Sequence, residues 1–103
     1  MKLLKTLRRE RSTGLTNYVN STYIDIVSFY QDDLKRLYRA FNQQYEGYGS
    51  KSVHQESINE CMETLTPTDL IDRYITNGFK IIDDAFVDPA GNLKQIPGKN
   101  ETA

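Results

Sequence analysis

Few side chains in this sequence are of the types that catalyse reactions or bind metals. The chain has one histidine, His54, and one cysteine, Cys61. We interpret His54 as a surface residue, and we expect Cys61, which falls in an apolar pattern, to be a buried and unreactive thiol. A single cysteine excludes an internal disulfide and a cysteine-based zinc site. Nucleophilic catalysis and thiolate metal binding are therefore not predicted.

The acidic residues do not form a metal-binding pattern either. Asp83–Asp84 are adjacent, and Asp69 and Asp72 are three residues apart, on what we predict to be a helix. Adjacent helical side chains point about 100° apart, and the spacing of an EF-hand loop is missing. Gly47 and Gly49 lead into no phosphate-binding Gly-Lys-Ser/Thr sequence. The sequence predicts no catalytic residue, metal, cofactor or small-molecule substrate.

Basic residues are more suggestive, because they gather near the start of the chain. Residues 1–11 hold five Lys and Arg residues against Glu10, although the whole chain has a net charge of −1. A second group follows on the polar side of a predicted helix. The candidate phosphate contacts are Lys2, Lys5, Arg8, Arg9, Arg11, Lys35, Arg36 and Arg39. The acidic remainder argues against a dedicated nucleic-acid binder, but a confined basic patch is compatible with binding.

A tyrosine-rich apolar stripe dominates the prediction of the fold. At about 100° per residue, ten of the twelve large apolar residues between Tyr23 and Tyr48 share one side of a helical wheel. Thr22 and Asp25 match a capping box at its start, and Gly47 and Gly49 match a helix stop. These features predict a single long helix over about residues 21–47.

Two further helices are predicted. Ser52 and Gln55 fit a capping box, followed by an apolar stripe to Leu65, which indicates a helix over about residues 52–65. Thr66-Pro67 is the clearest helix start in the chain. The apolar residues after it favour one helix over residues 67–86. The alternative is a helix that ends at Asn77–Gly78, followed by a strand at Phe79–Ile82.

The expected architecture is an all-α small helical bundle. Residues 1–14 form a basic N-terminal arm or short helix, residues 15–96 form one helical domain with a turn or small hairpin near 87–96, and residues 97–103 form a frayed tail. No apolar run approaches the roughly 20 residues that cross a bilayer. The first residues lack the apolar region of a secretory signal, so a cytoplasmic location is expected.

The leading functional hypothesis is a non-enzymatic protein–protein interaction module, a small regulator, inhibitor or assembly factor. Tyrosine is enriched at binding hot spots, and the stripe looks longer than the other helices can cover. The partner is a second copy of the chain or a larger protein. The predicted interface residues are Tyr23, Ile26, Val27, Tyr30, Phe41, Tyr45 and Tyr48. The alternative is nucleic-acid binding through the basic residues. A helix–turn–helix at residues 65–67 is disfavoured, because its recognition helix would begin with acidic residues.

Overall fold

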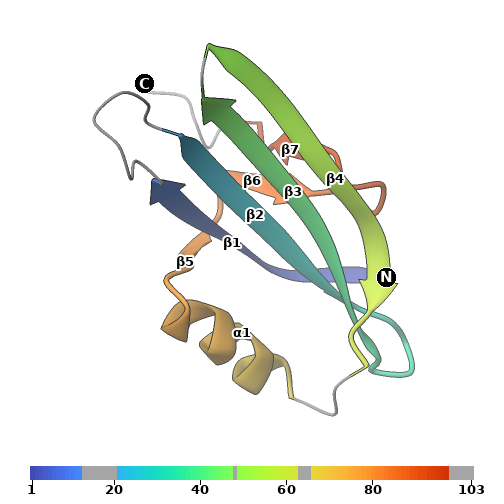
Figure 1. Ribbon diagram of the computed structural model, residues 1–103. Coiled ribbons are helices and arrows are strands. Elements are labelled where there is room, and N and C mark those ends of the chain that lie inside the picture. Colours follow the sequence, from blue (N-terminus) through green and yellow to red (C-terminus); the bar gives the residue numbers. More distant parts are fainter. Residues whose placement is uncertain (13–20, 48, 63–65, 98–103) are drawn as a thin grey trace.

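Antiparallel β-sheet is the main component of this protein, so the expected all-α bundle is wrong. The computed structural model describes residues 1–12, 21–47, 49–62 and 66–97. Five strands form one antiparallel sheet in the order β4-β3-β2-β1-β5 (Figure 1). The long strands are β1 (Lys2–Ser12), β2 (Thr22–Gln31), β3 (Leu37–Gly47) and β4 (Ser50–Glu60). The later elements are α1 (Pro67–Thr76), β5 (Lys80–Ile82), β6 (Ala85–Val87) and β7 (Leu93–Gln95).

The residues expected in one long helix form β2 and β3, joined by a tight turn. These strands pair without a break from Thr22 opposite Glu46 to Gln31 opposite Leu37. The turn contains no glycine, proline or asparagine. Instead the Asp32 carboxylate accepts hydrogen bonds from the backbone N–H groups of Leu34 and Arg36, at 2.9 and 2.8 Å. The sequence therefore gives only a weak sign of the turn that splits the predicted helix.

The helical pattern arose because β2 is the central long strand and is buried on both faces. Every residue from Asp25 to Tyr30 is buried. A strand of this kind lacks the alternation of apolar and polar residues by which half-exposed strands are recognised. The two large apolar residues outside the predicted stripe were Ile24 and Phe29, and Phe29 is only 1% exposed. A residue that the helical wheel placed outside the apolar stripe is thus almost completely buried, which contradicts a helix with one buried side.

The other predicted helices also need correction. Residues 2–12, expected as an arm or short helix, form β1, and most of residues 52–65 belongs to β4. The helix start at Thr66 is confirmed, because its side chain accepts a hydrogen bond from the Asp69 N–H at 3.2 Å. The helix ends at Asn77 and Gly78, and β5 follows, as in the alternative that was disfavoured. The expected hairpin near residues 87–96 is present as β6 and β7.

Two layers cover opposite faces of the sheet. We call the side that contacts α1 the helix face; its core consists of Leu7, Val27, Phe29, Leu37, Leu70 and Phe79. The other side, the hairpin face, packs against β6 and β7 through a core of Ile26, Tyr30, Ala40 and Val87. In Figure 1, α1 lies at the lower left, next to β1 and β5, and the β6–β7 hairpin lies behind the sheet. Within the described ranges, no helix has both the length and the apolar character needed to cross a membrane. Most of the expected frayed tail, residues 98–103, lies outside the described part of the chain.

Candidate functional site: a cleft beside the helix

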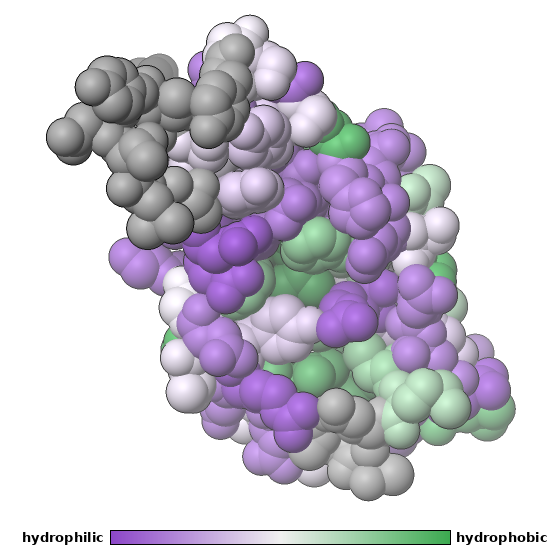
Figure 2. All heavy atoms as spheres, in the orientation of Figure 1, coloured by the Kyte–Doolittle hydropathy of each residue, from purple (hydrophilic) through white to green (hydrophobic). Residues whose placement is uncertain are grey.

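A cleft of about 670 Å³ lies on the helix face, between α1 and strands β3 and β4. The ten residues of α1 rise about 1.5 Å each, whereas the eleven residues of β3 and of β4 rise about 3.3 Å each, so both strands are more than twice as long as the helix. Figure 2 shows a hollow in this face, with hydrophobic groups at its base and hydrophilic groups around it. The residues that line the cleft include Arg9, Arg39, Phe41, Glu60, Arg73 and Tyr74.

One end of the cleft is held by a buried carboxylate. Asp25, on β2, is 0% exposed and lies between Arg9 of β1 and Gln43 of β3. Arg9 donates two hydrogen bonds to one Asp25 oxygen, at 3.0 and 3.2 Å. Arg11 donates to both oxygens, at 2.7 and 3.2 Å, and the Gln43 amide donates at 2.8 Å. A buried charge needs such partners, and here two arginines and an amide supply them.

The partners of Asp25 also determine how it titrates. Burial favours the neutral acid and raises the pKa of Asp25, but the hydrogen bonds from Arg11, Gln43 and Arg9 outweigh burial and leave the pKa below its ordinary value. The Asp25 carboxylate in turn raises the pKa of Arg11. Asp25 is therefore ionised at neutral pH and unsuited to take up a proton, and its chief effect is to fix the two guanidinium groups in place.

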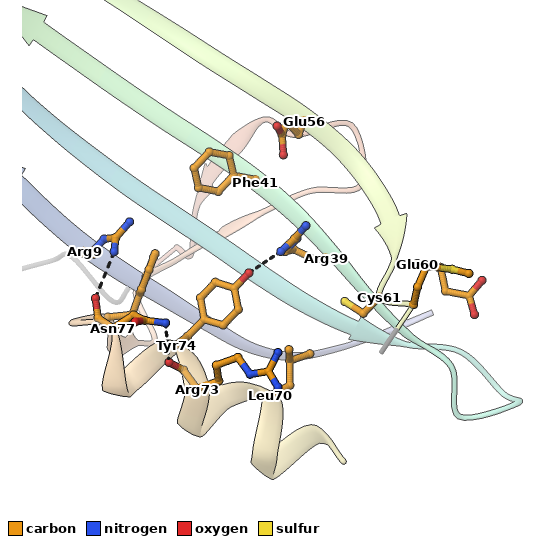
Figure 3. Close-up of a pocket in the computed structure, with 12 residues that line it drawn as sticks. Arg9, Arg39, Phe41, Glu56, Glu60, Cys61, Leu70, Arg73, Tyr74 and Asn77 are labelled. Carbon is orange, nitrogen blue, oxygen red and sulfur yellow. Dashed lines mark hydrogen bonds between the residues drawn. The ribbon is translucent and has the colours of Figure 1, made fainter. Parts of the chain in front are cut away.

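Aromatic rings and an arginine form the middle of the cleft. Tyr74 of α1 packs edge-on against Phe29 and Phe79, with ring centroids 5.0 and 5.1 Å apart. Its hydroxyl accepts a hydrogen bond from Arg39 Nη1 at 2.6 Å, which raises the pKa of Arg39 (Figure 3). The Arg9 guanidinium lies 4.4 Å from the Phe79 ring centroid and donates to the Asn77 carbonyl at 3.2 Å. The rings thus link the helix to the sheet, and two arginines hold this arrangement.

The rim of the cleft carries charges of both signs on different elements. Arg73 comes from α1, whereas Glu56 and Glu60 come from β4 (Figure 3). Cys61 also lines the cleft. His54, the other residue considered for chemistry, is exposed on β4, where its Nε2 lies 3.2 Å from a Glu56 oxygen. The cleft is therefore amphipathic, with aromatic rings in its interior and charges of both signs at its rim.

The structure divides the six described residues of the predicted interface between the two faces. Tyr23, Val27, Phe41 and Tyr45 belong to the helix face, and of these Phe41 lines the cleft. Ile26 and Tyr30 are buried in the hairpin-face core, at 4% and 5% exposure. Tyr48 lies outside the described residues. A helix would have placed all seven on one surface, but residues of opposite parity on a strand point to opposite faces.

The predicted phosphate contacts are also dispersed. Arg9 and Arg11 share the helix face and are paired with Asp25, while Arg8 points to the other face and lies 3.4 Å from Glu10. Arg36 is bound to Asp32 at 2.6 Å within the β2–β3 turn, and Lys35 occupies the same turn. Arg39 enters the cleft. Lys2 and Lys5 are exposed on the first part of β1.

Asp25, Gln43 and Tyr74 are central to this site, and the sequence did not indicate them. In the expected long helix over about residues 21–47, Asp25 is part of the capping box and Gln43 lies outside the apolar stripe. The useful signal was the alternation Arg9-Glu10-Arg11, which on a strand puts both arginines on one face. Their buried partner lies on another strand, and pairing between strands is not visible in one sequence.

Comparison of the chain with protein-family models, curated proteins and solved structures found no match.

Proposed function

We propose that this protein is a non-enzymatic protein-binding module whose cleft on the helix face receives an extended segment of a partner protein. The observation that carries the proposal is the combination of an aromatic interior, formed by Phe41 and Tyr74, with a rim of both charges. Interfaces gain most of their affinity from a few buried apolar or aromatic anchors, and their polar rims determine register and selectivity.

The distribution of charge favours a peptide over a simple anion. Arg39 and Arg73 attract negative groups, but Glu56 and Glu60 line the same cleft and repel them. A peptide satisfies both, because its side chains carry charges of either sign and its backbone both donates and accepts hydrogen bonds. We therefore expect the bound segment to carry one aromatic or aliphatic anchor with an acidic residue on one side and a basic residue on the other.

The titratable groups of the site support binding better than catalysis. The Asp25 carboxylate is occupied by three donor side chains, and its lowered pKa makes it a poor general base. The guanidinium of Arg39 is directed at the Tyr74 hydroxyl. These groups fix the positions of the side chains that form the cleft, and a binding site needs such a fixed arrangement.

A second candidate, nucleic-acid binding, has one specific observation in its favour. Arg11 lies over the Tyr23 ring at 4.8 Å, and the Tyr23 and Tyr45 ring centroids are 4.9 Å apart on the same face as Arg9. Tyr23 and Tyr45 are partly exposed, and rings of this kind beside arginines can stack with unpaired bases. The buried Asp25 charge offsets one of the two arginines, however, so this surface is less basic than the residue types imply.

Selection from a random peptide library on the immobilised protein tests the main proposal. We expect the selected peptides to share one apolar anchor with flanking charges. Glu56→Lys should weaken binding of a selected peptide about tenfold, which corresponds to about 1.4 kcal/mol, because Glu56 pairs with Phe41 on the helix face. Glu10→Lys is the matched control, because it makes the same change on the hairpin face. Peptides without a shared anchor, or equal loss in both variants, would contradict a binding site in the cleft.

A fluorescent single-stranded oligonucleotide tests the second candidate. If the helix face binds nucleic acid, affinity falls steeply as salt rises, and Arg11→Ala weakens it more than Arg36→Ala. Binding that is equally sensitive to both variants would place the contact elsewhere.

A further inference from the structure

The outer edge of β4 is open over most of its length. β4 is the last strand of the sheet and pairs with β3 on its inner side, and within the described residues no strand pairs with its outer side (Figure 1). Its one outer backbone hydrogen bond there runs from the Ile58 N–H to the Pro89 carbonyl, at 2.7 Å. The loop between β6 and β7 therefore closes the edge at Ile58, and it also contacts the Gln55 side chain and the Glu56 backbone. Within the described residues, no backbone hydrogen bond is made to the outer edge of β4 before Ile58.

Hairpin geometry shows which backbone groups of this edge are free. Two residues separate Gly47 from Ser50, which are paired, and the pair that flanks a two-residue hairpin loop exchanges backbone hydrogen bonds. In an antiparallel ladder such pairs alternate with pairs that point their N–H and C=O groups outward. The outward groups of β4 are accordingly those of Lys51, Val53 and Gln55, whose midpoint is Val53.

This edge is complementary to itself. If two copies meet antiparallel about a two-fold axis at Val53, Lys51 lies opposite Gln55 and Val53 lies opposite Val53. Ser50 then faces Glu56 and Ser52 faces His54, so no like charges stand directly opposite each other. Val53 is 61% exposed and is an apolar residue in a strand that is otherwise mostly polar. Pairing would bury that side chain against its own copy.

We propose that two copies of this chain associate through β4, antiparallel and centred on Val53, so that their sheets become continuous. An exposed strand edge presents unpaired backbone groups that another strand can satisfy. A second copy is the partner that fits, because all three outward residues find outward partners only in this register. The inference goes beyond the proposed function, since the edge is distinct from the cleft and the two can be tested separately.

Cross-linking tests both the dimer and its register. In a Cys61→Ala background, Val53→Cys should form a disulfide-linked dimer under mild oxidation. Opposite residues of a hydrogen-bonded pair have Cα atoms about 5.5 Å apart, within the range that a disulfide spans. Lys51→Cys is the matched control, because the two copies of residue 51 would lie about 14 Å apart, four residues along the strand. Mixing Lys51→Cys with Gln55→Cys should restore the cross-link.

Sedimentation across a concentration series provides an independent measurement on the unmodified protein. We expect a monomer–dimer equilibrium whose dissociation constant rises at least tenfold in Val53→Pro, which removes an outward N–H, but not in Val53→Thr, which keeps it. Circular dichroism verifies that both variants fold. A monomer at every concentration would overturn the proposal, and so would a dimer whose dissociation constant is unchanged in Val53→Pro. In the cross-linking experiment, Lys51→Cys forming a disulfide as fast as Val53→Cys would also overturn it. A monomer that recruits only a strand of another protein also overturns it.

Discussion

Arg11 donates to both oxygens of the Asp25 carboxylate, so that a partly exposed cation on β1 neutralises a fully buried anion on the central strand. The side chain of Arg11 is 38% exposed, and that of Asp25 is 1% exposed. Arg9 binds the same carboxylate from the side of the cleft. Asp25 therefore couples the packing of the sheet to the position of an arginine that lines the candidate site.

Asp25→Asn should destabilise the protein without changing its fold. The amide keeps the shape of the carboxylate but loses its charge, and its NH₂ group would face donors on Arg9, Arg11 or Gln43. Breaking a buried ion pair costs roughly 3–5 kcal/mol, and because the arginines can turn toward water we expect about 2–3 kcal/mol. Urea unfolding measures the loss. Asp33→Asn, in the exposed β2–β3 turn, is the control and should change stability by less than about 0.5 kcal/mol.

The contribution of Asp25 to stability should disappear in acid. Its pKa in the folded protein is lowered, whereas in the unfolded chain it is near the ordinary value of about 3.9. As the pH falls through this window, the unfolded chain takes up a proton before the folded protein does, so stability decreases. The difference in unfolding free energy between the wild type and Asp25→Asn should be constant above about pH 5 and shrink below about pH 4.

This comparison isolates Asp25 from two other carboxylates. Asp32 and Asp88 also have lowered pKa values, since each accepts backbone hydrogen bonds in a turn, but both are present in the two proteins being compared. A stability difference that persists unchanged to pH 2.5 would show that the charge of Asp25 is not what stabilises the native state.

Gly91→Ala should be markedly more damaging than Gly49→Ala, although both glycines have positive φ, at 91° and 73°. A Cβ on Gly91 would lie 2.9 Å from the Glu56 carbonyl oxygen and 3.1 Å from its backbone nitrogen, whereas a Cβ on Gly49 would meet nothing within 4 Å. Gly49→Ala should therefore cost only the left-handed conformation, about 1 kcal/mol. Gly91→Ala adds a clash with rigid backbone, for a total of about 2–4 kcal/mol. Thermal and urea unfolding measure both, and equal losses would contradict the close approach of the loop to β4.

The sequence predicted local chemistry better than the arrangement of strands. The helix start at Thr66 and the turn near residues 87–96 could be predicted because each depends on side chains a few residues away. The Thr66 hydroxyl accepts a hydrogen bond from the Asp69 N–H, and the Asp88 carboxylate accepts one from the Asn92 N–H. The identity of β2 was not visible, because its alternation is hidden by burial on both faces. On a helical wheel, most of the large apolar residues of β2 also fall on one side, and only Ile24 and Phe29 fall outside it.

The candidate site was even less accessible to prediction, because long-range pairing creates it. In the sequence, Arg9 belongs to the basic residues near the start of the chain, and Tyr74 falls within the predicted helix over residues 67–86. They share a cleft only because β1 lies beside β2 and α1 folds back over the same face. Contacts of this kind follow from strand order and register, which composition and periodicity do not specify.

In the turn between β2 and β3, Lys35→Gly should stabilise the protein. Lys35 has a φ of 65°, and within the described residues it is the one non-glycine with positive φ. A left-handed conformation costs a non-glycine residue about 1–2 kcal/mol, and the greater freedom of glycine in the unfolded chain offsets part of the gain, so we expect about 0.5–1 kcal/mol. Lys94→Gly, in β7, is the control and should lower stability by a similar amount, since glycine weakens a strand. Urea unfolding measures both variants, and a Lys35→Gly variant as destabilised as Lys94→Gly would contradict the left-handed conformation of Lys35.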